Sequence, residues 1–202
     1  ASRLSYFSGL DEGYILRSNL RVTAPRFRKE LLRQEGLTVG GLDSRYTVAE
    51  YDQAAAQPTH NDAASIAISS AYTAALHEHL TQNLDVKMDR PYLTSNRAIY
   101  PKWNWRPVPQ GRTWEPSYVN VAPHLSSAMR TNQELQVMVA NGYYDLVTPF
   151  FDAEYTFQRH GILLDRVQMK YYAGGHMMYT QHDELKQLCA DIRGFLIGCL
   201  QQ

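Results

Sequence analysis

The sequence predicts an α/β fold in which parallel strands with flanking helices follow a helical segment. From residue 117 onward, helical and strand-like stretches alternate with short connections, an order typical of a parallel sheet covered by helices. Before residue 116 the apolar residues follow helical spacing, interrupted by loops. We therefore expect two parts, residues 1–116 and residues 117–202, in a chain of 202 residues that is long enough to bury a core.

The first part is predicted to consist of helices and loops. Its apolar spacing predicts the end of a helix at 1–7, a short helix at 10–20, a helix opening at Thr23-Ala24-Pro25 and a long helix over 63–84. Threonine is a common N-cap and proline fits a first helical turn, while Asn61-Asp62 supplies the cap of the long helix. The glycines near residue 40 indicate a loop.

Residues 85–116 show little periodicity. They hold all three tryptophans, Trp103, Trp105 and Trp114, among several prolines. We expect these rings to pack between the two parts, although they could also line a pocket for an apolar substrate side chain. A stretch of about 30 residues without regular structure is uncommon inside a domain and is often functional.

The second part carries the α/β pattern. Its predicted elements are a helix at 117–130, a buried strand at 135–140, a helix at 150–160, a strand at 166–172 and an amphipathic helix at 181–202. Asn141-Gly142 predicts a turn that ends the first strand. Cys189 and Cys199 lie about 280° apart around the last helix, so they cannot pair with each other, and we expect two small buried residues.

Composition excludes several classes of function. The 20 basic and 20 acidic residues balance, whereas nucleic-acid binding requires a clustered surplus of Lys and Arg. No run approaches 18 apolar residues, so no membrane span is predicted. Two cysteines are too few for a disulfide framework or a thiolate metal site, and His77 and His79 point apart on a helix. We expect no metal and no cofactor.

Two polar residues follow the predicted strands at the positions where active sites gather in parallel sheets. Asp145 comes five residues after the strand ending at Ala140, and His176 comes four residues after the strand ending at Tyr172. Adjacent parallel strands bring such loops side by side, so Asp145 could accept a hydrogen bond from the imidazole. A carboxylate in that position fixes the histidine tautomer and stabilises the imidazolium formed when histidine takes a proton from a serine. We therefore predict that Asp145 and His176 are catalytic.

The nucleophile of such a site is not found in the sequence. Acid before histidine is the chain order of the α/β-hydrolases, whose serine comes earlier, in a G-x-S-x-G elbow. Residues 1–202 contain no G-x-S-x-G, and Ser44 lies among predicted helices without a second glycine. We expect the serine to lie upstream of this chain.

These motifs resemble those of the serine carboxypeptidases. The run from Asn141 to Pro149, NGYYDLVTP, resembles the acid motif of that family, and GGHMMY, from Gly174 to Tyr179, resembles its histidine motif. The first half, with FRKELLR from Phe27 and GLDSRY from Gly41, is similar to the helical insertion of a bacterial branch. The resemblance implies the C-terminal part of an α/β-hydrolase fold, preceded by a helical cap segment. The low cysteine content also favours a bacterial origin, and the family suggests a periplasmic or secreted protein.

The resemblance also implies roles and partners. Asp145 would orient His176, which would act as general base and then general acid, and Met177 would touch the leaving residue of the substrate. The substrate would be a peptide with a free C-terminal carboxylate, and the N-terminal part of the same protein would carry the serine. Two alternatives stay open: another α/β-hydrolase, such as an esterase or a different peptidase, or a non-catalytic binding module of the same fold.

Overall fold

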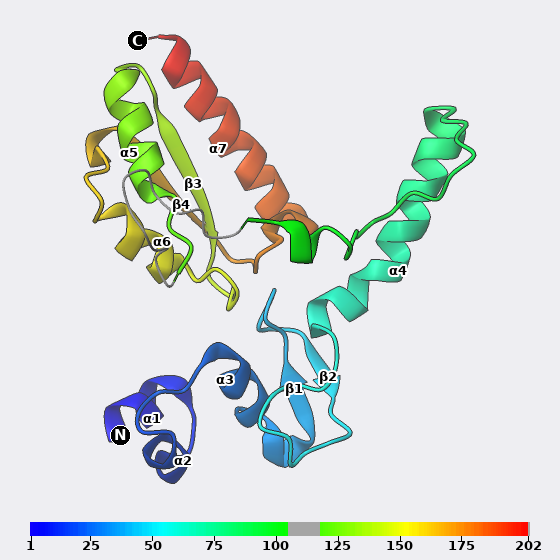
Figure 1. Ribbon diagram of the computed structural model, residues 1–202, viewed down its shortest axis with the longest axis vertical. Helices are drawn as coiled ribbons and strands as arrows, with labels where there is room; N and C mark the ends of the chain where they lie inside the picture. Colours follow the sequence, from blue (N-terminus) through cyan, green and yellow to red (C-terminus); the bar gives the residue numbers. More distant parts are fainter. Residues whose placement is uncertain (105–117, 202) are drawn as a thin grey trace.

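The computed structural model describes residues 1–104 and 118–201, which form a mixed α/β structure (Figure 1). An N-terminal body contains α1 (Ser2–Ser8), α2 (Glu12–Arg17), α3 (Ala24–Glu30), β1 (Leu37–Val39) and β2 (Thr47–Ala49). The helix α4 (Ala63–Glu78) projects from it. An α/β body contains α5 (Ala122–Thr131), β3 (Val137–Gly142), α6 (Phe150–Phe157), β4 (Val167–Tyr172) and α7 (His182–Leu200).

The α/β body is built on the predicted parallel pair. β3 and β4 are parallel, with a register that runs from Val137 opposite Val167 to Gly142 opposite Tyr172. Because side chains alternate along a strand, β4 presents Tyr171 toward Glu154 of α6 and Tyr172 toward Asp191 of α7. The pair therefore lies between α6 on one face and α7 on the other, as Figure 1 shows.

The core of this body is formed where α5 meets the strands. Ala122, Met129 and Ile162 are buried there, and partly buried side chains from β3, β4 and α6 pack around them. The helix predicted from residue 117 begins only at Ala122, whose backbone N–H donates to the Asn120 side chain. The predicted boundary at residue 116 lies outside the described residues, as do Trp105 and Trp114.

The prediction of a turn at Asn141-Gly142 is wrong. β3 continues through both residues, because the Asn141 amide donates to Lys170 O and Gly142 pairs with Tyr172. Gly142 has no side chain to keep β3 away from its neighbour. A Cβ there would lie 2.2 Å from Gly175 O.

The prediction that the first part is made of helices and loops is also wrong in one place. β1 and β2 form an antiparallel hairpin, with Leu37 opposite Ala49 and Val39 opposite Thr47. Each strand has three residues, too few for an alternating pattern to stand out from the surrounding glycines. We call residues 40–46, which connect the two strands, the hairpin loop.

A buried ion pair holds the N-terminal body together. Lys29 Nζ of α3 lies 2.8 Å from Glu50 Oε2, and the two side chains are only 1% and 2% exposed. Lys29 also donates to Asp52 O, and the Glu50 carboxylate accepts hydrogen bonds from Thr38 and Thr59. One carboxylate thus connects α3, the hairpin and the segment that leads to α4.

Hydrogen bonding decides the protonation of Glu50. Burial alone would raise the pKa of this carboxyl, but hydrogen bonds from Lys29 and Thr59 outweigh it and hold the pKa well below the ordinary 4.5. A carboxyl with a depressed native pKa contributes stability above its unfolded pKa, and that stability is lost as the pH falls through the native value.

α4 extends away from both bodies with little burial. Asp62 caps it as predicted, accepting a hydrogen bond from Ala64 N. Only Ala63 and Ala64 at its base are buried. No helix in the described ranges is both long and apolar enough to cross a membrane.

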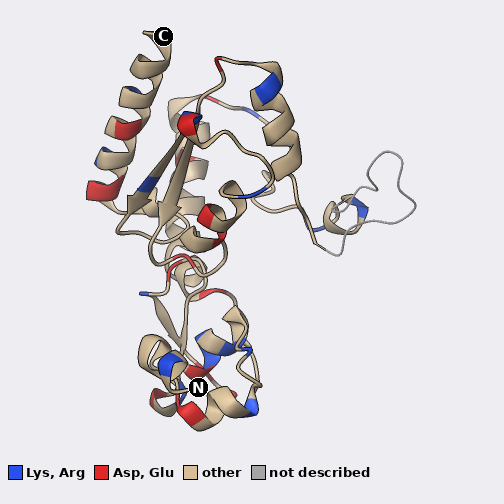
Figure 2. Cartoon of the chain, turned by 90° about the vertical axis from the view of Figure 1, so that its left-hand side faces the viewer, with Lys and Arg blue, Asp and Glu red and all other residues tan. Residues whose placement is uncertain are grey.

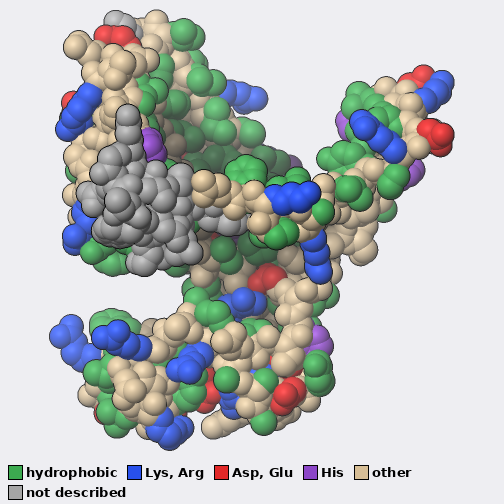
Figure 3. Space-filling model, viewed as in Figure 1, with side chains coloured by type: hydrophobic (Ala, Val, Ile, Leu, Met, Phe, Trp, Pro, Cys, Tyr) green, Lys and Arg blue, Asp and Glu red, His purple; other side chains and the backbone are tan. Residues whose placement is uncertain are grey.

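A large apolar surface is left uncovered. The accessible surface of the chain is 14608 Å², whereas a compact monomer of 23.1 kDa exposes about 9,700 Å². Figure 3 shows apolar side chains over α4 and over the α/β body; the exposed ones include Ile66, Tyr72, Leu76, Leu196 and Ile197. Cys189 and Cys199 on α7 are free thiols that are half-buried, not buried as we predicted. Charged residues of both signs are interspersed over the N-terminal body (Figure 2).

We predict that replacing Lys29 with Met lowers the free energy of unfolding by about 3–5 kcal/mol, because Glu50 is then buried without its cation. Lys87→Met is the control. It removes an exposed pair with Asp85, whose side chains are 83% and 75% exposed, and should cost less than about 1 kcal/mol. Urea unfolding measures both. Equal stability of the Lys29→Met and wild-type proteins would contradict the structural role given to the pair.

Candidate active site

The two strands end side by side and deliver one polar residue each. Asp145 follows the end of β3 by three residues, and His176 follows the end of β4 by four. Two backbone bonds tie the loops together, because Tyr143 N donates to Tyr172 O and Tyr144 N donates to Gly174 O, both at 3.0 Å. The parallel register therefore places the two loops in contact before any side chain is considered.

Asp145 is buried and fully engaged. Its side chain Oδ1 accepts hydrogen bonds from Val147 N at 2.8 Å and Thr148 N at 3.0 Å, the local turn that aspartate commonly forms. The other oxygen, Oδ2, accepts from Thr148 Oγ1 at 2.6 Å and from His176 Nδ1 at 2.8 Å. Only 5% of the residue is exposed. The carboxylate is thus fixed by its own loop and directed at the imidazole.

The hydrogen bond predicted between Asp145 and His176 is present. A carboxylate partner requires the proton to reside on Nδ1, so the neutral imidazole leaves Nε2 as an acceptor. The His176 side chain is 42% exposed. Among the described residues, no hydrogen-bonding group meets Nε2. The ring therefore has one nitrogen held by the protein and the other free to take a proton.

Thr148 also belongs to this site and was not among the predicted residues. Its hydroxyl donates to Asp145 Oδ2, and its oxygen lies 3.1 Å from His176 Nδ1, where it can accept from the same N–H. An aspartate that forms a turn accepts hydrogen bonds from residues shortly after it in the chain, and Thr148 comes three residues after Asp145. That spacing is the signal that could have identified Thr148.

The pKa of Asp145 is lower than the ordinary 3.8. Burial acts in the opposite direction and raises the pKa, but the hydrogen bonds from Thr148, His176 and Val147 stabilise the ionised form and outweigh it. No Lys or Arg in the described ranges pairs with this carboxylate. Its charge is balanced by hydrogen bonds alone, so a protonated His176 would be its cation.

The loop that carries His176, residues 173–177, which we call the histidine loop, packs closely against its neighbours at its two glycines. A Cβ on Gly175 would lie 2.2 Å from Leu42 O and 2.5 Å from Asp43 Cβ, and a Cβ on Gly174 would lie 2.7 Å from Met178. Neither glycine has a positive φ. The neighbouring hairpin loop therefore leaves no room for a side chain at Gly175, and Met178 leaves none at Gly174.

Met177 follows His176 in the chain and lines a small cavity at the base of α4. Together with neighbours from the hairpin loop and α4 it encloses a cavity of about 10 Å³, lined by Leu42, Asp43, Tyr46, Ala64, Ile68, Met177 and Thr180. That volume corresponds to about one water molecule. Ser44 is held by its backbone N–H to Tyr144 O, and no described serine hydroxyl bonds His176.

A larger cavity of about 460 Å³ borders the loop that carries Asp145, residues 143–149, which we call the acid loop. Leu146 and Pro149 of that loop form one wall, and apolar side chains of α1, α2 and α3 form the other. Among the described residues, no group of three His, Cys, Asp or Glu side chains could hold a metal ion.

We predict that Thr148→Val raises the pKa of Asp145, because the variant lacks the hydroxyl that stabilises the carboxylate. A depressed native pKa gives stability that is present above the unfolded value and is lost as the pH falls through the native one. That loss should therefore occur at a higher pH in the variant. A ¹³C NMR titration of the carboxyl carbon reads this directly. Thr131→Val is the control, because the Thr131 hydroxyl donates to Ser127 O, far from Asp145 in the chain, and it should leave the titration of Asp145 unchanged. An unshifted pKa of Asp145 in Thr148→Val would refute the role given to the Thr148 hydroxyl.

Gly175→Ala should destabilise the chain by about 1–3 kcal/mol and shift the NMR signals of His176, because the new methyl group collides with the hairpin loop. Gly194 of α7 is the matched control. A Cβ there meets nothing within 4 Å, so Gly194→Ala should raise stability by about 0.5–1 kcal/mol. Unfolding experiments on both variants test the pair, and a stable Gly175→Ala protein with unchanged His176 signals would contradict the packing argument.

No family model, no curated protein and no solved structure matches this chain. What the site can do must therefore be inferred from its own residues, which are an exposed imidazole and the buried carboxylate that holds it.

Proposed function

We propose that this chain supplies the histidine and the acid of a Ser-His-Asp hydrolase, and that another segment of polypeptide supplies the serine. The observation that carries the proposal is the 2.8 Å bond from His176 Nδ1 to Asp145 Oδ2, with Nε2 free among the described residues. This is the arrangement that a general base needs, with one nitrogen oriented by a carboxylate and the other available to a nucleophile.

In the proposed reaction His176 accepts a proton and then donates it, once during acylation of the serine and once during hydrolysis of the acyl-enzyme. Nε2 takes the proton of the serine hydroxyl as the serine oxygen attacks the acyl carbon, and returns it to the leaving group as the acyl bond breaks. Water then attacks the acyl-enzyme and gives its proton to Nε2. His176 returns that proton to the serine oxygen as the carboxylic acid product leaves. Each time the imidazole becomes an imidazolium, it faces the ionised Asp145.

The electrostatics of Asp145 support this role. A carboxylate already paired with Lys or Arg would gain little from a second cation, but the partners of Asp145 within residues 1–104 and 118–201 are hydrogen-bond donors without a Lys or Arg among them. Its lowered pKa keeps it ionised at neutral pH. An imidazolium formed at His176 during the reaction would face this carboxylate across the hydrogen bond from Nδ1.

We infer the substrate class and the finer fold from the resemblance of the two motifs to serine carboxypeptidases. The chain would form the C-terminal part of an α/β-hydrolase, and the substrate would be a peptide with a free terminal carboxylate whose leaving residue meets Met177. The parallel pair β3–β4 with helices on both faces supports this fold.

An esterase or another peptidase would use the same pair. Hydrolysis of N-blocked dipeptides, compared with their C-terminal amides and with short-chain esters, separates these activities, because a carboxypeptidase needs the free carboxylate. A binding module of the same fold would hydrolyse none of them.

The test uses the complete protein that contains this chain and a fluorophosphonate, which reacts with activated serines. We expect one labelled serine outside residues 1–202, and a labelling rate at least about 10⁴-fold lower in His176→Ala. His182→Ala, which removes an exposed histidine at the start of α7, is the matched control and should react as wild type does. Labelling of a serine inside residues 1–202, or a rate that His176→Ala leaves unchanged, would overturn the proposal.

A further inference from the structure

The hairpin loop of the N-terminal body contacts both loops of the candidate active site. Leu146 N donates to Gly41 O at 2.9 Å, and Ser44 N donates to Tyr144 O at 2.9 Å. His176 N itself donates to Leu42 O at 2.6 Å. The backbone on both sides of Asp145, and the backbone of His176, are thus fixed to a segment that lies at least a hundred residues earlier in the chain.

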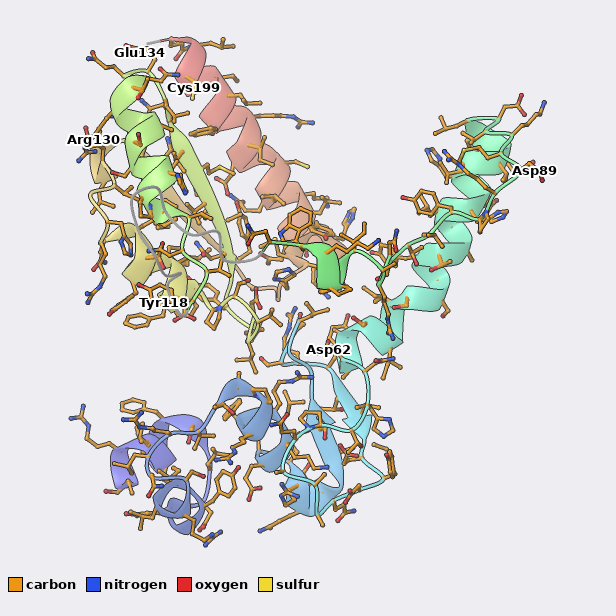
Figure 4. The ribbon with its side chains drawn as sticks, viewed as in Figure 1. Asp62, Asp89, Tyr118, Arg130, Glu134 and Cys199 are labelled. Carbon is orange, nitrogen blue, oxygen red and sulfur yellow. The ribbon has the colours of Figure 1, made fainter. Side chains whose placement is uncertain are left out.

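This loop is itself held firmly at its start. The Asp62 carboxylate accepts hydrogen bonds from Gly41 N and Leu42 N, and it pairs with Arg28 Nη2 at 2.9 Å. Arg28 Nε also donates to Val39 O, where β1 ends. Figure 4 shows Asp62 at the base of α4, beside the hairpin. The hairpin loop is therefore held rigidly, and the acid loop and the histidine loop both bond to it.

Arg45 is the side chain of the hairpin loop that contacts both the acid loop and the histidine loop. Its Nε and Nη2 lie 3.0 Å and 2.7 Å from the two oxygens of Asp43, which is only 6% exposed. Its remaining nitrogen, Nη1, donates to Ala173 O at 2.8 Å, and the guanidinium lies 4.4 Å from the ring centroid of Tyr144. Tyr144 precedes Asp145 in the chain, and Ala173 precedes His176 by three residues.

Only arginine can make this set of contacts. The planar guanidinium matches both oxygens of a carboxylate, keeps a third nitrogen for a carbonyl and stacks on an aromatic ring. The ammonium of lysine is a single point and cannot meet Asp43, Ala173 and Tyr144 together. The ion pair with Asp43, which is partly exposed, adds little stability by itself, so the value of the contact lies in geometry.

We propose that Arg45 is a positioning residue for the Asp145–His176 pair, which fixes the acid loop through Tyr144 and the histidine loop through Ala173 O. The proposal rests on the proposed function for its effect on catalysis, but its effect on the hydrogen bond between Asp145 and His176 does not depend on that function. Without Arg45 the two loops keep their backbone bonds but lose the side chain that sets their separation.

The structural test is made on this chain. The Nδ1–H proton of His176, held by a carboxylate, should give a low-field imidazole signal in the ¹H NMR spectrum. We expect Arg45→Met to broaden or remove that signal, and Arg45→Lys to fail to restore it. Tyr144→Leu removes the aromatic ring and leaves the contacts of Arg45 with Asp43 and with Ala173 O, so it should weaken the signal. This variant replaces Arg45→Met in the test if Arg45→Met does not fold.

The matched control is Arg33→Met. Arg33 also pairs with a carboxylate, Glu30 at 2.5 Å, and also donates to a backbone carbonyl, Ala55 O at 3.0 Å, but it touches neither site loop. Its loss should change stability to a similar extent and leave the His176 signal unchanged. A wild-type signal in Arg45→Met, or an equal loss in Arg33→Met, would overturn the proposal.

The catalytic test is made on the complete protein. Arg45→Met and Arg45→Lys should lower the fluorophosphonate labelling rate by up to about 100-fold, the range expected for small displacements of a catalytic group, while Arg33→Met labels as wild type does. A labelling rate that Arg45→Met leaves unchanged would overturn the positioning role. If no variant and no wild-type protein is labelled, the proposed function fails, and the NMR signal still decides the role of Arg45.

Discussion

The pairing of Gly142 with Tyr172 at the carboxyl ends of β3 and β4 is the contact on which the site depends. It sets the two strands in parallel with no offset between their ends, so the loops that follow leave the sheet together. A strand shifted by one residue would turn every side chain to the opposite face and separate Asp145 from His176. The absence of a side chain at Gly142 permits this pairing, because the space that a Cβ would fill is occupied by Gly175 O.

Two buried carboxylates in the chain are stabilised in different ways, and the difference bears on function. Glu50 has hydrogen-bond donors and the ammonium of Lys29, so its charge is already neutralised within a body that it holds together. Asp145 has a comparable set of donors but no lysine or arginine in the described part of the chain. Glu50 is arranged for stability. Asp145 keeps its charge available to a group that becomes positive only for part of the time, which is what His176 can do.

Much of this could be predicted from local sequence, and the rest required tertiary contacts. Alternating helix and strand patterns identified β3, β4 and α7, and the positions of Asp145 and His176 after the strands predicted their meeting. The hairpin β1–β2 was not predicted, because strands of three residues are too short to show an alternating pattern of apolar residues. The contacts of Arg45 with Tyr144 and Ala173 span about 100 and 128 residues along the chain, and no local pattern reports such a distance. The ion pair of Arg45 with Asp43 joins residues only two apart and is the local part of this set of contacts.

The uncovered apolar surface gives the proposed function a physical context. The total accessible surface of the chain exceeds that of a compact protein of its mass by about 4,900 Å², and large apolar side chains of α4 and α7 are among the exposed residues. A segment that brought a serine to His176 Nε2 would have to approach the carboxyl ends of β3 and β4, where α4 and the N-terminal body already stand. The hairpin loop fixes the acid and the histidine before such a segment arrives, through backbone bonds and Arg45. The geometry of the pair can therefore be complete within this chain while the surface that would receive the nucleophile remains open.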